Sequence, residues 1–485
     1  MGFDAARYLA ARFGDRIALV EPRLERTWTF LALDRAAEEW ADRLDAAGVG
    51  PGGRVGVLTS NRGTVVALLF GCWKVGAALA PLNYRSAPEE LRSEVGRLGP
   101  SATVAEVGAA QHPEVADAAP GAAIPLESPP AAPPRPEGAS GTTGEAPGLI
   151  LSTGGSTGRP KAAVLSVRAL LANALNTASA WGLTPDDVGL GPFPFFHTGG
   201  WNVLTLPLLF EGGRSVLLDR PDPRGILEAV DREKVTVLSS VPTTLVDLVR
   251  LPEFERVSLS TVRFVKSGGG HSPELVVHRF RDRGIPFYQG YGLTEAGPNL
   301  FYSGIADLEH PGTVGRPTPL AELALRGVDG ALANEGELWV RGPLAFSGYL
   351  DDPEATRDAV VDGWVATGDL LRRDAEGFYY FVGRRKLMFK SGGENVYPTE
   401  VEAVLETHPE VVEAAVVGTP DPRWGEVGCA FVHRASPVSE EELSAFLRLR
   451  LAHYKVPRRF VWRDEIPRTP AGKKDYPRLR EEVTP

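Results

Sequence analysis

Strand-like and helix-like segments alternate through most of this 485-residue chain, and this alternation is its strongest constraint on the fold. An early strand and helix are expected at 54–59 and 64–75, and the pattern is clearest between residues 222 and 289. There the expected order is helix 222–234, strand 235–241, helix 243–250, strand 262–266, helix 272–283 and strand 285–289. Strands separated by helices of about ten residues predict parallel sheets covered by helices. Ligands of such sheets bind at the carboxyl ends of the strands.

Residues 385–485 follow a different pattern. Thr399–Glu402 and Ser439–Glu442 have the pattern of capping boxes that open short helices, and strands are expected between them at 411–417 and 428–433. The predicted fold is therefore a large, multi-subdomain α/β domain with mostly parallel sheets over residues 1–384, followed by a small α+β domain. A further stretch at 116–147, rich in proline, alanine and glycine, is expected to be a linker or exposed loop.

Charge and cysteine content exclude several classes of protein. The net charge is 52 − 62 = −10, which argues against a general nucleic-acid-binding surface. Cys72 and Cys429 are the only cysteines, too few for a disulfide framework or a cysteine-built zinc site. The apolar stretch 64–82 is interrupted by Lys74 and two glycines, and is predicted to be a buried helix rather than a membrane span. Since the N-terminus lacks a secretory signal, we expect a cytoplasmic protein without stable membrane insertion.

Lysine is scarce, so each lysine is informative: nine of the 52 basic residues are lysine and 43 are arginine. One of them, Lys161, ends the segment STGGSTGRPK at 152–161, directly after an apolar strand. Backbone N–H groups and hydroxyls in such a loop can surround phosphate oxygens, and the lysine adds positive charge. The glycine-to-lysine spacing differs from that of a Walker A loop, and an ordinary Gly/Ser loop is the alternative.

Two further segments carry side chains suited to a nucleotide. In QGYGLTEAG (289–297), Tyr291 can offer a flat face to a base and Glu295 a hard oxygen ligand for Mg²⁺. In WVATGDL (364–370), Asp369 can accept hydrogen bonds from both ribose hydroxyls, or merely cap a turn. Taken singly, neither segment decides the function.

Six segments in order resemble the motifs of the adenylate-forming superfamily. They are STGGSTGRPK, QGYGLTEAG, GELWVRGP (336–343), WVATGDL, GRRKLMFKSGGENVYPTEVE (383–402) and PRTPAGKK (467–474). The superfamily includes acyl-CoA synthetases, adenylation domains of peptide synthetases and firefly luciferase. The resemblance covers almost the whole chain. It implies that residues 1–384 bind ATP and a carboxylic acid, and that residues 385–485 form a rotating lid.

The resemblance also implies a reaction in two steps. The substrate carboxylate attacks the α-phosphate of ATP, which gives an acyl-adenylate and pyrophosphate, and the thiol of CoA then displaces AMP. Activation replaces a poor leaving group, hydroxide, by a good one. We therefore expect an ATP- and Mg²⁺-dependent acyl-CoA ligase that uses CoA as co-substrate. Dimers are common in the superfamily, so a homodimer is compatible with the sequence.

Family roles can be carried over to matching positions of the large domain. The phosphate loop would hold the β- and γ-phosphates, Thr294 would contact the α-phosphate and Glu295 would bind Mg²⁺. Tyr291 would stack on adenine, while Asp369 and Arg384 would hold the ribose. The residues expected to bind the nucleotide or CoA are Thr153, Gly155, Ser156, Thr157, Gly158, Lys161, Gly269, Gly290, Tyr291, Gly292, Asp369, Arg384, Gly392, Gly393 and Trp424.

Two adjacent lysines compete for the catalytic position in the lid. Lys473 directly follows Gly472, as the family's lysine does, and is expected to stabilise the negative charge that gathers on phosphorus during adenylation. Spacing alone does not exclude Lys474. Lys386, two residues after the motif arginine, matches the family's hinge position.

The lid also carries the residues expected to act in the second step. Gly392 and Gly393 would enter the active site, where absent side chains leave room for the thiol arm of CoA. Trp424, with Tyr454 and Arg458, resembles positions that contact CoA in some ligases, and packing within the lid is the alternative for Trp424. Departures from the family pattern occur at Gly154 and Ala162 in the phosphate loop and at Leu387 after the hinge position.

The acid is expected to bind beside His197, because FFHTGGW (195–201) resembles the family segment whose histidine lies at the acyl site. The pocket would draw on residues 197–203, 239–243, 267–270 and 290–293, with Trp201 and Val203 lining it. Glycines that would create space are Gly199, Gly200, Gly268, Gly269 and Gly270. These segments hold no Asp to bind an α-ammonium group, which argues against amino acids. A fatty acid is favoured, with benzoate- or cinnamate-like aryl acids close behind.

Other functions remain as alternatives. A stand-alone adenylation enzyme would load a separate carrier protein, and a luciferase-like oxidase would share the first step. A catalytically silent sensor of acids or adenylates is disfavoured, because Lys473, Glu295 and Asp369 are all present.

Overall fold

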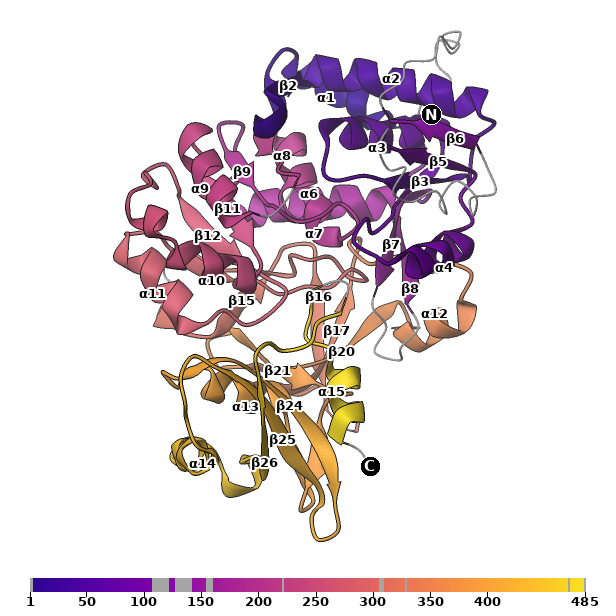
Figure 1. Cartoon of the computed structure of the whole chain (residues 1–485). Helices are drawn as coiled ribbons and strands as arrows, with labels where there is room; N and C mark the ends of the chain where they lie inside the picture. The colour runs from indigo at the N-terminus through magenta and orange to yellow at the C-terminus, as the bar shows by residue number, and fades with distance from the viewer. Residues whose placement is uncertain are drawn as a thin grey trace.

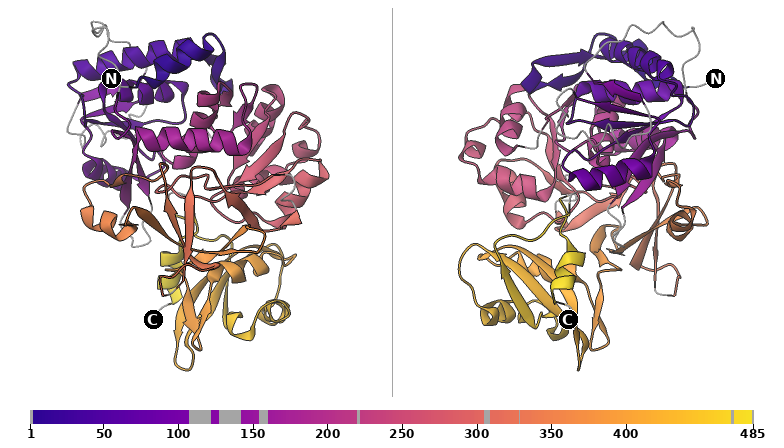
Figure 2. Two further views of the ribbon diagram at one scale, coloured as in Figure 1. Left: turned by 180° about the vertical axis from the view of Figure 1, so that it is seen from behind. Right: turned by 45° about the vertical axis from the view of Figure 1, so that its right-hand side comes forward.

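The computed structural model describes residues 3–106, 122–126, 142–153, 160–219, 222–304, 309–327, 329–469 and 472–483. Helices and three sheets form the chain up to Arg384, and a smaller unit of strands and helices follows. This smaller unit, coloured orange to yellow, lies at one end of the molecule in every view (Figures 1 and 2). The architecture confirms the predicted fold class of a large α/β domain followed by a small α+β domain.

One seven-stranded sheet contains the region of clearest alternation, in the order β13-β12-β11-β9-β10-β1-β2. Its strands are parallel except for the pair β1–β2. The strands are β1 (Ile17–Glu21), β2 (Arg26–Thr29), β9 (Val188–Leu190), β10 (Arg214–Val216), β11 (Val237–Ser240), β12 (Phe264–Ser267) and β13 (Phe287–Gln289). The intervening helices are α9 (Pro223–Arg232), α10 (Pro242–Arg250) and α11 (Glu274–Asp282). All six elements expected between residues 222 and 289 are therefore present.

A second seven-stranded sheet has the order β18-β8-β7-β4-β3-β5-β6. Its strands are β3 (Arg54–Leu58), β4 (Ala78–Pro81), β5 (Ala102–Ala105), β6 (Ala122–Pro125), β7 (Pro147–Thr153), β8 (Lys161–Ser166) and β18 (Gly348–Tyr349). The helices of this half of the chain are α1 (Ala5–Phe13), α2 (Phe30–Ala46), α3 (Gly63–Val75), α4 (Pro88–Leu98), α6 (Val167–Trp181), α7 (Thr198–Asn202) and α8 (Thr205–Glu211). The expected linker at 116–147 is in part wrong, since residues 122–125 pair with β5 as an edge strand. Most of that stretch lies outside the described residues.

Helix α3 is the apolar segment that could be mistaken for a membrane span. Its residues from Val65 to Val75 are all buried, including Lys74, as expected for a helix covered on all sides. Within the described ranges, no helix combines the length and the apolar character needed to cross a membrane.

A third sheet, formed by residues 301–384, is antiparallel throughout and has the order β14-β15-β21-β20-β17-β16, with β19 paired to β20. Its strands are β14 (Phe301–Tyr302), β15 (Thr313–Pro317), β16 (Glu322–Arg326), β17 (Glu335–Arg341), β19 (Val360–Val361), β20 (Trp364–Arg373) and β21 (Tyr379–Arg384), and α12 (Pro353–Ala359) precedes β19. The parallel pattern therefore stops before this region. The connections 327–334 and 374–378 within this sheet are too short for the crossover that a parallel pair needs.

The small domain is built on a five-stranded sheet in the order β23-β22-β25-β24, with β26 parallel to β25. Its elements are β22 (Phe389–Ser391), β23 (Glu394–Val396), α13 (Pro398–Leu405), β24 (Val411–Asp421), β25 (Gly425–Arg434), α14 (Glu440–Arg448), β26 (Arg459–Arg463) and α15 (Tyr476–Val483). A short 3₁₀ turn, η5 (His453–Lys455), lies between α14 and β26, and two others, η1 (Pro22–Leu24) and η3 (Pro252–Glu255), lie in the large domain. The boundary at 384/385 stays a prediction.

The expected capping box at Thr399 is wrong, and at Ser439 one of the two hydrogen bonds of a capping box is present. Ser439 does cap α14, because its side chain accepts a hydrogen bond from the backbone N–H of Glu442. Helix α13, in contrast, begins at Pro398, and the Thr399 hydroxyl donates to the carbonyl oxygen of Val382 at 2.8 Å. Proline at the first helical position has no N–H that needs a cap.

A buried cation fastens the N-terminal helices to α3. The Lys74 side chain is 1% exposed, and its ammonium lies 2.8 Å from Asp4, 2.9 Å from Asp34 and 2.7 Å from Glu38. Asp4 caps α1, while Asp34 and Glu38 lie one turn apart on α2. One lysine therefore joins α1, α2 and α3.

Replacing Lys74 by Met should destabilise the protein by about 3 kcal/mol or more, because three carboxylates then lose their shared partner. The urea midpoint of unfolding measures the loss. Lys234→Met is the control: it removes an exposed pair with Asp231, and such pairs contribute about 1 kcal/mol or less. Equal urea midpoints for Lys74→Met and Lys234→Met would contradict the stabilising role of the Lys74 contacts.

Candidate functional site

Three neighbouring parallel strands end at one edge of the first sheet. Ser240, Ser267 and Gln289, the last residues of β11, β12 and β13, lie side by side in register. The loops that leave these strands therefore emerge together. They include 267–270 and 290–293, two of the segments expected to form the acid pocket, and this is the edge at which parallel sheets bind ligands.

Gln289 ties two of these loops together. Its side-chain amide donates to the carbonyl oxygen of Gly270 at 2.7 Å and accepts from the backbone N–H of Ser272 at 3.2 Å. A methyl group at Gly268 would meet no atom within 4 Å, and Gly269 has a φ of +83° that favours glycine. The loop 268–270 is therefore held at its end, and it faces open space at Gly268.

Gly290 and Gly292 serve close packing of the backbone. A Cβ at Gly292 would lie 2.2 Å from the carbonyl carbon of Pro298, and one at Gly290 would lie 2.9 Å from the carbonyl oxygen of Ser267. Both distances are shorter than atoms tolerate, so side chains are excluded at these positions. The tight loop places Tyr291 between them.

Asp369 is the centre of a buried polar cluster. Its carboxylate accepts a hydrogen bond from the Tyr291 hydroxyl at 2.7 Å and lies 3.2 Å from Nε of Arg384, its partner across β20 and β21. Burial, and then the Asp369 charge, raise the pKa of Tyr291 well above its usual value. The rings of Phe301 and Phe381 lie 5.7 and 5.9 Å from that of Tyr291. Three residues assigned to adenine and ribose are thus in one place.

Glu295 has a partner that the sequence did not suggest. The Tyr349 hydroxyl donates to Oε1 of Glu295 at 2.9 Å, and Nζ of Lys161 lies 4.8 Å from the centre of the Tyr349 ring. Tyr349 reaches this position because β18 pairs with β8, the strand that begins at Lys161. Tyr349 therefore stands between the lysine of the phosphate loop and the expected Mg²⁺ ligand.

The phosphate loop is described only at its ends. Gly155, Ser156, Thr157 and Gly158 lie outside the described residues. Thr153 and Lys161 face each other across β7 and β8. The Arg97 guanidinium, from α4, binds both ends of the loop: it donates to the Ser152 hydroxyl at 2.9 Å and to the carbonyl oxygen of Pro160 at 2.8 Å.

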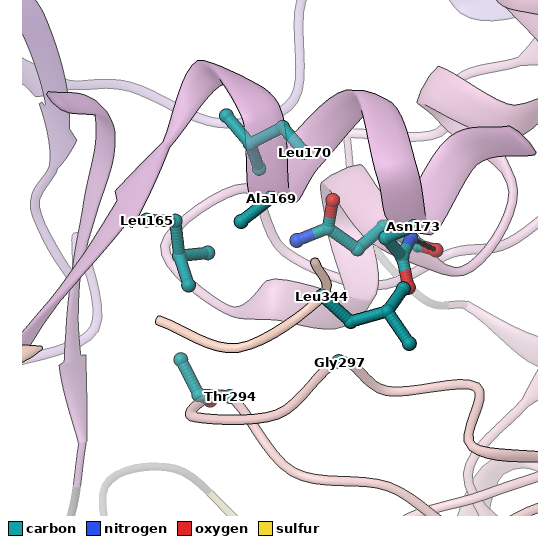
Figure 3. Close-up of a pocket in the computed structure, with 8 residues that line it drawn as sticks. Leu165, Ala169, Leu170, Asn173, Thr294, Gly297 and Leu344 are labelled. Atoms are coloured by element: carbon teal, nitrogen blue, oxygen red, sulfur yellow. Dashed lines mark hydrogen bonds between the residues drawn. The ribbon is translucent and has the colours of Figure 1, made fainter. Parts of the chain in front are cut away.

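Thr294 borders a small cavity that Figure 3 shows between its loop and helix α6. The cavity measures about 10 Å³, room for a single water molecule and too little for an organic acid. Oδ1 of Asn173 and Oδ1 of Asn202 are buried without a hydrogen-bond partner, and both residues line it.

The two lid lysines have opposite surroundings. The Lys474 ammonium is bound inside the lid, 3.2 Å from Glu402 and 3.0 Å from Glu406. Among the described residues, the Lys473 ammonium has no hydrogen bond or ion pair within the lid. Its pKa is lowered by burial and by Arg384, and Glu295 and Asp369 oppose that shift, so it lies within the field of the large domain's charges. This arrangement favours Lys473 as the lysine that acts on substrate.

His197 caps the N-terminus of helix α7, with Nδ1 accepting a hydrogen bond from the backbone N–H of Gly199 at 3.1 Å. Burial, and then the charge of Lys473, lower the pKa of His197 to about 4. The imidazole is therefore neutral near pH 7. With Nδ1 used as an acceptor, its proton is on Nε2.

The expected roles of Gly199, Gly200 and Trp201 need correction. A Cβ at Gly200 would lie 2.5 Å from the carbonyl oxygen of Pro194, and one at Gly199 would lie 3.0 Å from the Phe193 ring, so both glycines allow close packing rather than create space. Trp201 is 0% exposed. It stacks on Phe195 at 4.2 Å and belongs to the main core, so it does not line a pocket.

The residues assigned to the second step lie away from this cluster, inside the lid. A Cβ at Gly392 would come within 2.7 Å of the Trp424 ring, and the Gly392 N–H donates to the Trp424 carbonyl oxygen. Arg458 covers that ring at 4.8 Å. This fits the packing alternative for Trp424, and contact with CoA stays a prediction. Gly393 follows Gly392 in the turn between β22 and β23, while the hinge candidate Lys386 lies between β21 and β22.

Some site residues were missed for lack of a local signal. Tyr349, Arg97 and Gln289 each act through partners that only the folded chain brings near. Gln289 lies in a quoted motif, so its position at a strand end could have suggested a role.

Comparison with known proteins identifies the family. Residues 7–350 match the model of the AMP-binding enzyme family, and residues 400–473 match that of the AMP-binding enzyme C-terminal domain. A feruloyl-CoA synthase from Amycolatopsis sp is 38% identical over 92% of both chains. An indoleacetate–CoA ligase from Aromatoleum aromaticum is 36% identical over 93% of this chain and 92% of its own. A long-chain-fatty-acid–CoA ligase from Mycobacterium tuberculosis is 34% identical over 96% of this chain and 95% of its own.

Solved structures agree with this result. The o-succinylbenzoate CoA synthetase from Bacillus subtilis, in complex with its acyl-adenylate intermediate, matches with a TM-score of 0.90 at 29% identity over 98% of each chain. A further structure of that enzyme, in complex with ATP and a magnesium ion, has a TM-score of 0.88 at 28% identity over 99% of each chain. The chain belongs to the AMP-binding enzyme family within the adenylate-forming superfamily.

The state of His197 can be tested directly. Because its pKa lies near 4, below the ordinary value of 6.5, the folded protein should keep this ring neutral from pH 8 down to about 5. In ¹⁵N NMR of the histidine rings, the signals of His197 can be assigned because they are absent in His197→Asn. These signals should show the proton on Nε2 throughout that pH range. The unfolded chain would bind this proton below pH 6.5, so the histidine should lower stability as the pH falls from 6.5 to 4. A ring that titrates near pH 6.5 would contradict the assignment.

Proposed function

We propose that this enzyme, an acid–thiol ligase that forms AMP and pyrophosphate, joins an aromatic carboxylic acid to CoA through an acyl-adenylate. One observation carries the proposal. Lys473 of the small domain lies within the electrostatic field of Glu295, Asp369 and Arg384 of the large domain. A cation, a hard oxygen ligand and a buried carboxylate close together are the groups that adenylate formation needs.

Lys473 would act on the first step. The phosphorus under attack gathers negative charge, and a fixed ammonium stabilises that charge most effectively where protein surrounds it. Burial and Arg384 lower the Lys473 pKa, which reflects the cost of holding positive charge there before the nucleotide arrives. A bound anion would offset that cost.

Glu295 fits a magnesium ligand. Tyr349 occupies only one of its carboxylate oxygens, and Oε2 has no hydrogen bond among the described residues. Mg²⁺ commonly binds to one or two carboxylates and takes its other ligands from phosphate oxygens and water. The ion would draw charge from the phosphates when bound. Tyr349 and the nearby Lys161 would hold the carboxylate in place.

The neutral His197 would contact the acid. With its proton on Nε2, the ring can donate one hydrogen bond to a carboxylate oxygen of the acid. Because the ring is neutral, it is not expected to act as a proton donor in catalysis. That oxygen would be oriented towards the α-phosphate. Gly268, which faces open space, and the adjoining Gly269 and Gly270 would border the rest of the acid.

The substrate class rests on relatives rather than on a pocket. The sequence favoured a fatty acid. Two of the relatives with higher identity act, by their names, on feruloyl and indoleacetate groups, and one with lower identity acts on long-chain fatty acids. We therefore place aromatic acids first and fatty acids second. Carrier-protein loading remains the alternative for the second step.

A screen for pyrophosphate release tests the function. The purified enzyme is incubated with ATP, Mg²⁺ and one acid at a time, from cinnamate-like, indoleacetic, fatty and amino acid sets, with and without CoA. We expect release and a CoA thioester with an aromatic acid. Preference for fatty acids would overturn the substrate class alone. Pyrophosphate without any thioester would favour a carrier acceptor, and no release with any acid would overturn the function.

Tyr349→Phe tests the support of Glu295. Loss of this hydroxyl should weaken Mg²⁺ binding about tenfold, the usual effect of removing a group that orients a metal ligand. Mn²⁺ binding in the presence of ATP, followed by EPR, and the Mg²⁺ dependence of adenylation measure the change. Tyr380→Phe is the matched control, because it removes a similar 3.0 Å hydrogen bond to Asp374 at a turn. The same metal dependence in both variants would count against this role.

A further inference from the structure

We propose that Lys474 is a positioning residue, whose three contacts inside the small domain orient the chain so that the adjacent Lys473 faces Glu295 and Asp369. The inference rests on the proposed function, since it concerns the geometry of the first step. It explains why two consecutive lysines coexist in a chain that holds only nine.

The Lys474 ammonium uses all of its hydrogen-bonding capacity within the lid. It donates to Oε2 of Glu402 at 3.2 Å, to Oε1 of Glu406 at 3.0 Å and to the carbonyl oxygen of Ala414 at 2.5 Å. An ammonium has three N–H donors, so none remains for substrate. Lys474 is therefore an internal anchor and not a second candidate for catalysis.

The anchor itself is rigid. Glu402 lies on α13 and Glu406 is the residue that caps its C-terminus, one turn later, so their side chains share a face. Glu402 also accepts hydrogen bonds from the Val416 N–H at 2.8 Å and the Tyr476 hydroxyl at 2.9 Å. Glu406 accepts one from the Ala414 N–H at 3.2 Å. The lysine is thus bound to a helix and a strand that are already joined to each other.

The backbone on either side of the turn before Lys474 is joined by hydrogen bonds. Arg468 and Lys474 form an antiparallel bridge, and the Thr469 N–H donates to the Lys473 carbonyl oxygen at 2.8 Å. The Arg468 guanidinium donates to the Gly472 carbonyl oxygen at 3.0 Å and to Glu413 at 2.9 Å. The backbone of Lys473 is therefore held on both sides.

Lys474 is the bridge residue, and Lys473 lies in the bend directly before it. With Lys474 bound to Glu402 of α13, the backbone from which the Lys473 side chain leaves is fixed. The charges that act on the Lys473 ammonium are those of Arg384, Glu295 and Asp369, all in the large domain. Losing the anchor would let this segment turn and move the ammonium.

The alternative is that Lys474 merely stabilises the lid, and the same helix offers a matched control. Lys455 binds Glu400 of α13 at 2.6 Å and has a side-chain exposure of 19%, against 18% for Lys474. Lys455→Met therefore removes a comparable ion pair from the same helix, without touching the chain that carries Lys473.

The test measures the two half-reactions separately in the variants Lys474→Met and Lys455→Met. Adenylation is measured as pyrophosphate release in a single turnover, and thioester formation is measured from supplied acyl-adenylate and CoA. Lys474→Met should slow adenylation about 100-fold, the effect of a misplacement of about 1 Å in a catalytic group. It should change thioester formation less than threefold, and Lys455→Met should change neither rate by more than that. Melting temperatures report the loss of stability in both.

Two further measurements keep the outcome decisive if Lys474→Met does not fold. Glu406→Gln weakens one contact of the anchor and should slow adenylation alone, by a smaller factor. Adding Lys474→Met or Glu406→Gln to Lys473→Ala should cause little further loss, because the anchor acts only through Lys473.

Clear results would overturn the inference. They are adenylation that survives Lys474→Met to within threefold, equal loss of both half-reactions in Lys474→Met and Lys455→Met, or additive losses with Lys473→Ala. Absence of adenylation by the unaltered enzyme with every acid would instead overturn the proposed function.

Discussion

The site depends on one buried charge, the carboxylate of Asp369, whose side chain is 7% exposed. A carboxylate in that environment is tolerated only with well-placed partners, and the chain supplies them from distant segments. Tyr291 comes from the loop after the parallel sheet, and Arg384 ends the last strand of the antiparallel sheet. Satisfying one charge therefore joins the two sheets at a single point. It also determines where positive charge from the small domain is favourable.

Sequence patterns predicted the parts of the fold that local periodicity controls. The helices and strands between residues 222 and 289 are present because each is encoded in a short apolar repeat. The antiparallel sheet and the edge strand β6 depend on pairings between distant segments, which no local window contains. Thr399 shows the limit: its spacing to Glu402 matches a capping box, yet Pro398 starts the helix and the hydroxyl bonds elsewhere.

The candidate site divides in the same way. Residues in the motif loops, such as Asp369 and Arg384, could be assigned from the sequence because the motifs and their order along the chain resemble those of the family. Which of Lys473 and Lys474 faces the large domain could not be read from spacing, since the answer lies in contacts between Lys474 and residues more than 60 positions earlier. Tyr349 likewise reaches Glu295 only because β18 returns to β8. Trp201 was assigned to a pocket because composition cannot distinguish a lining aromatic from a core one.

The Thr399 hydroxyl has a further consequence for movement. Its acceptor, Val382, lies before the connection that contains Lys386, and Thr399 lies after it. Gly383 packs beside the same threonine, and a Cβ there would lie 3.1 Å from the Thr399 hydroxyl. If the small domain rotates about that connection, as the family resemblance implies, this hydrogen bond links the two sides that would separate, and breaking it would cost about 1 kcal/mol. In the arrangement described, a single hydroxyl thus ties the small domain to the strand that precedes the connection.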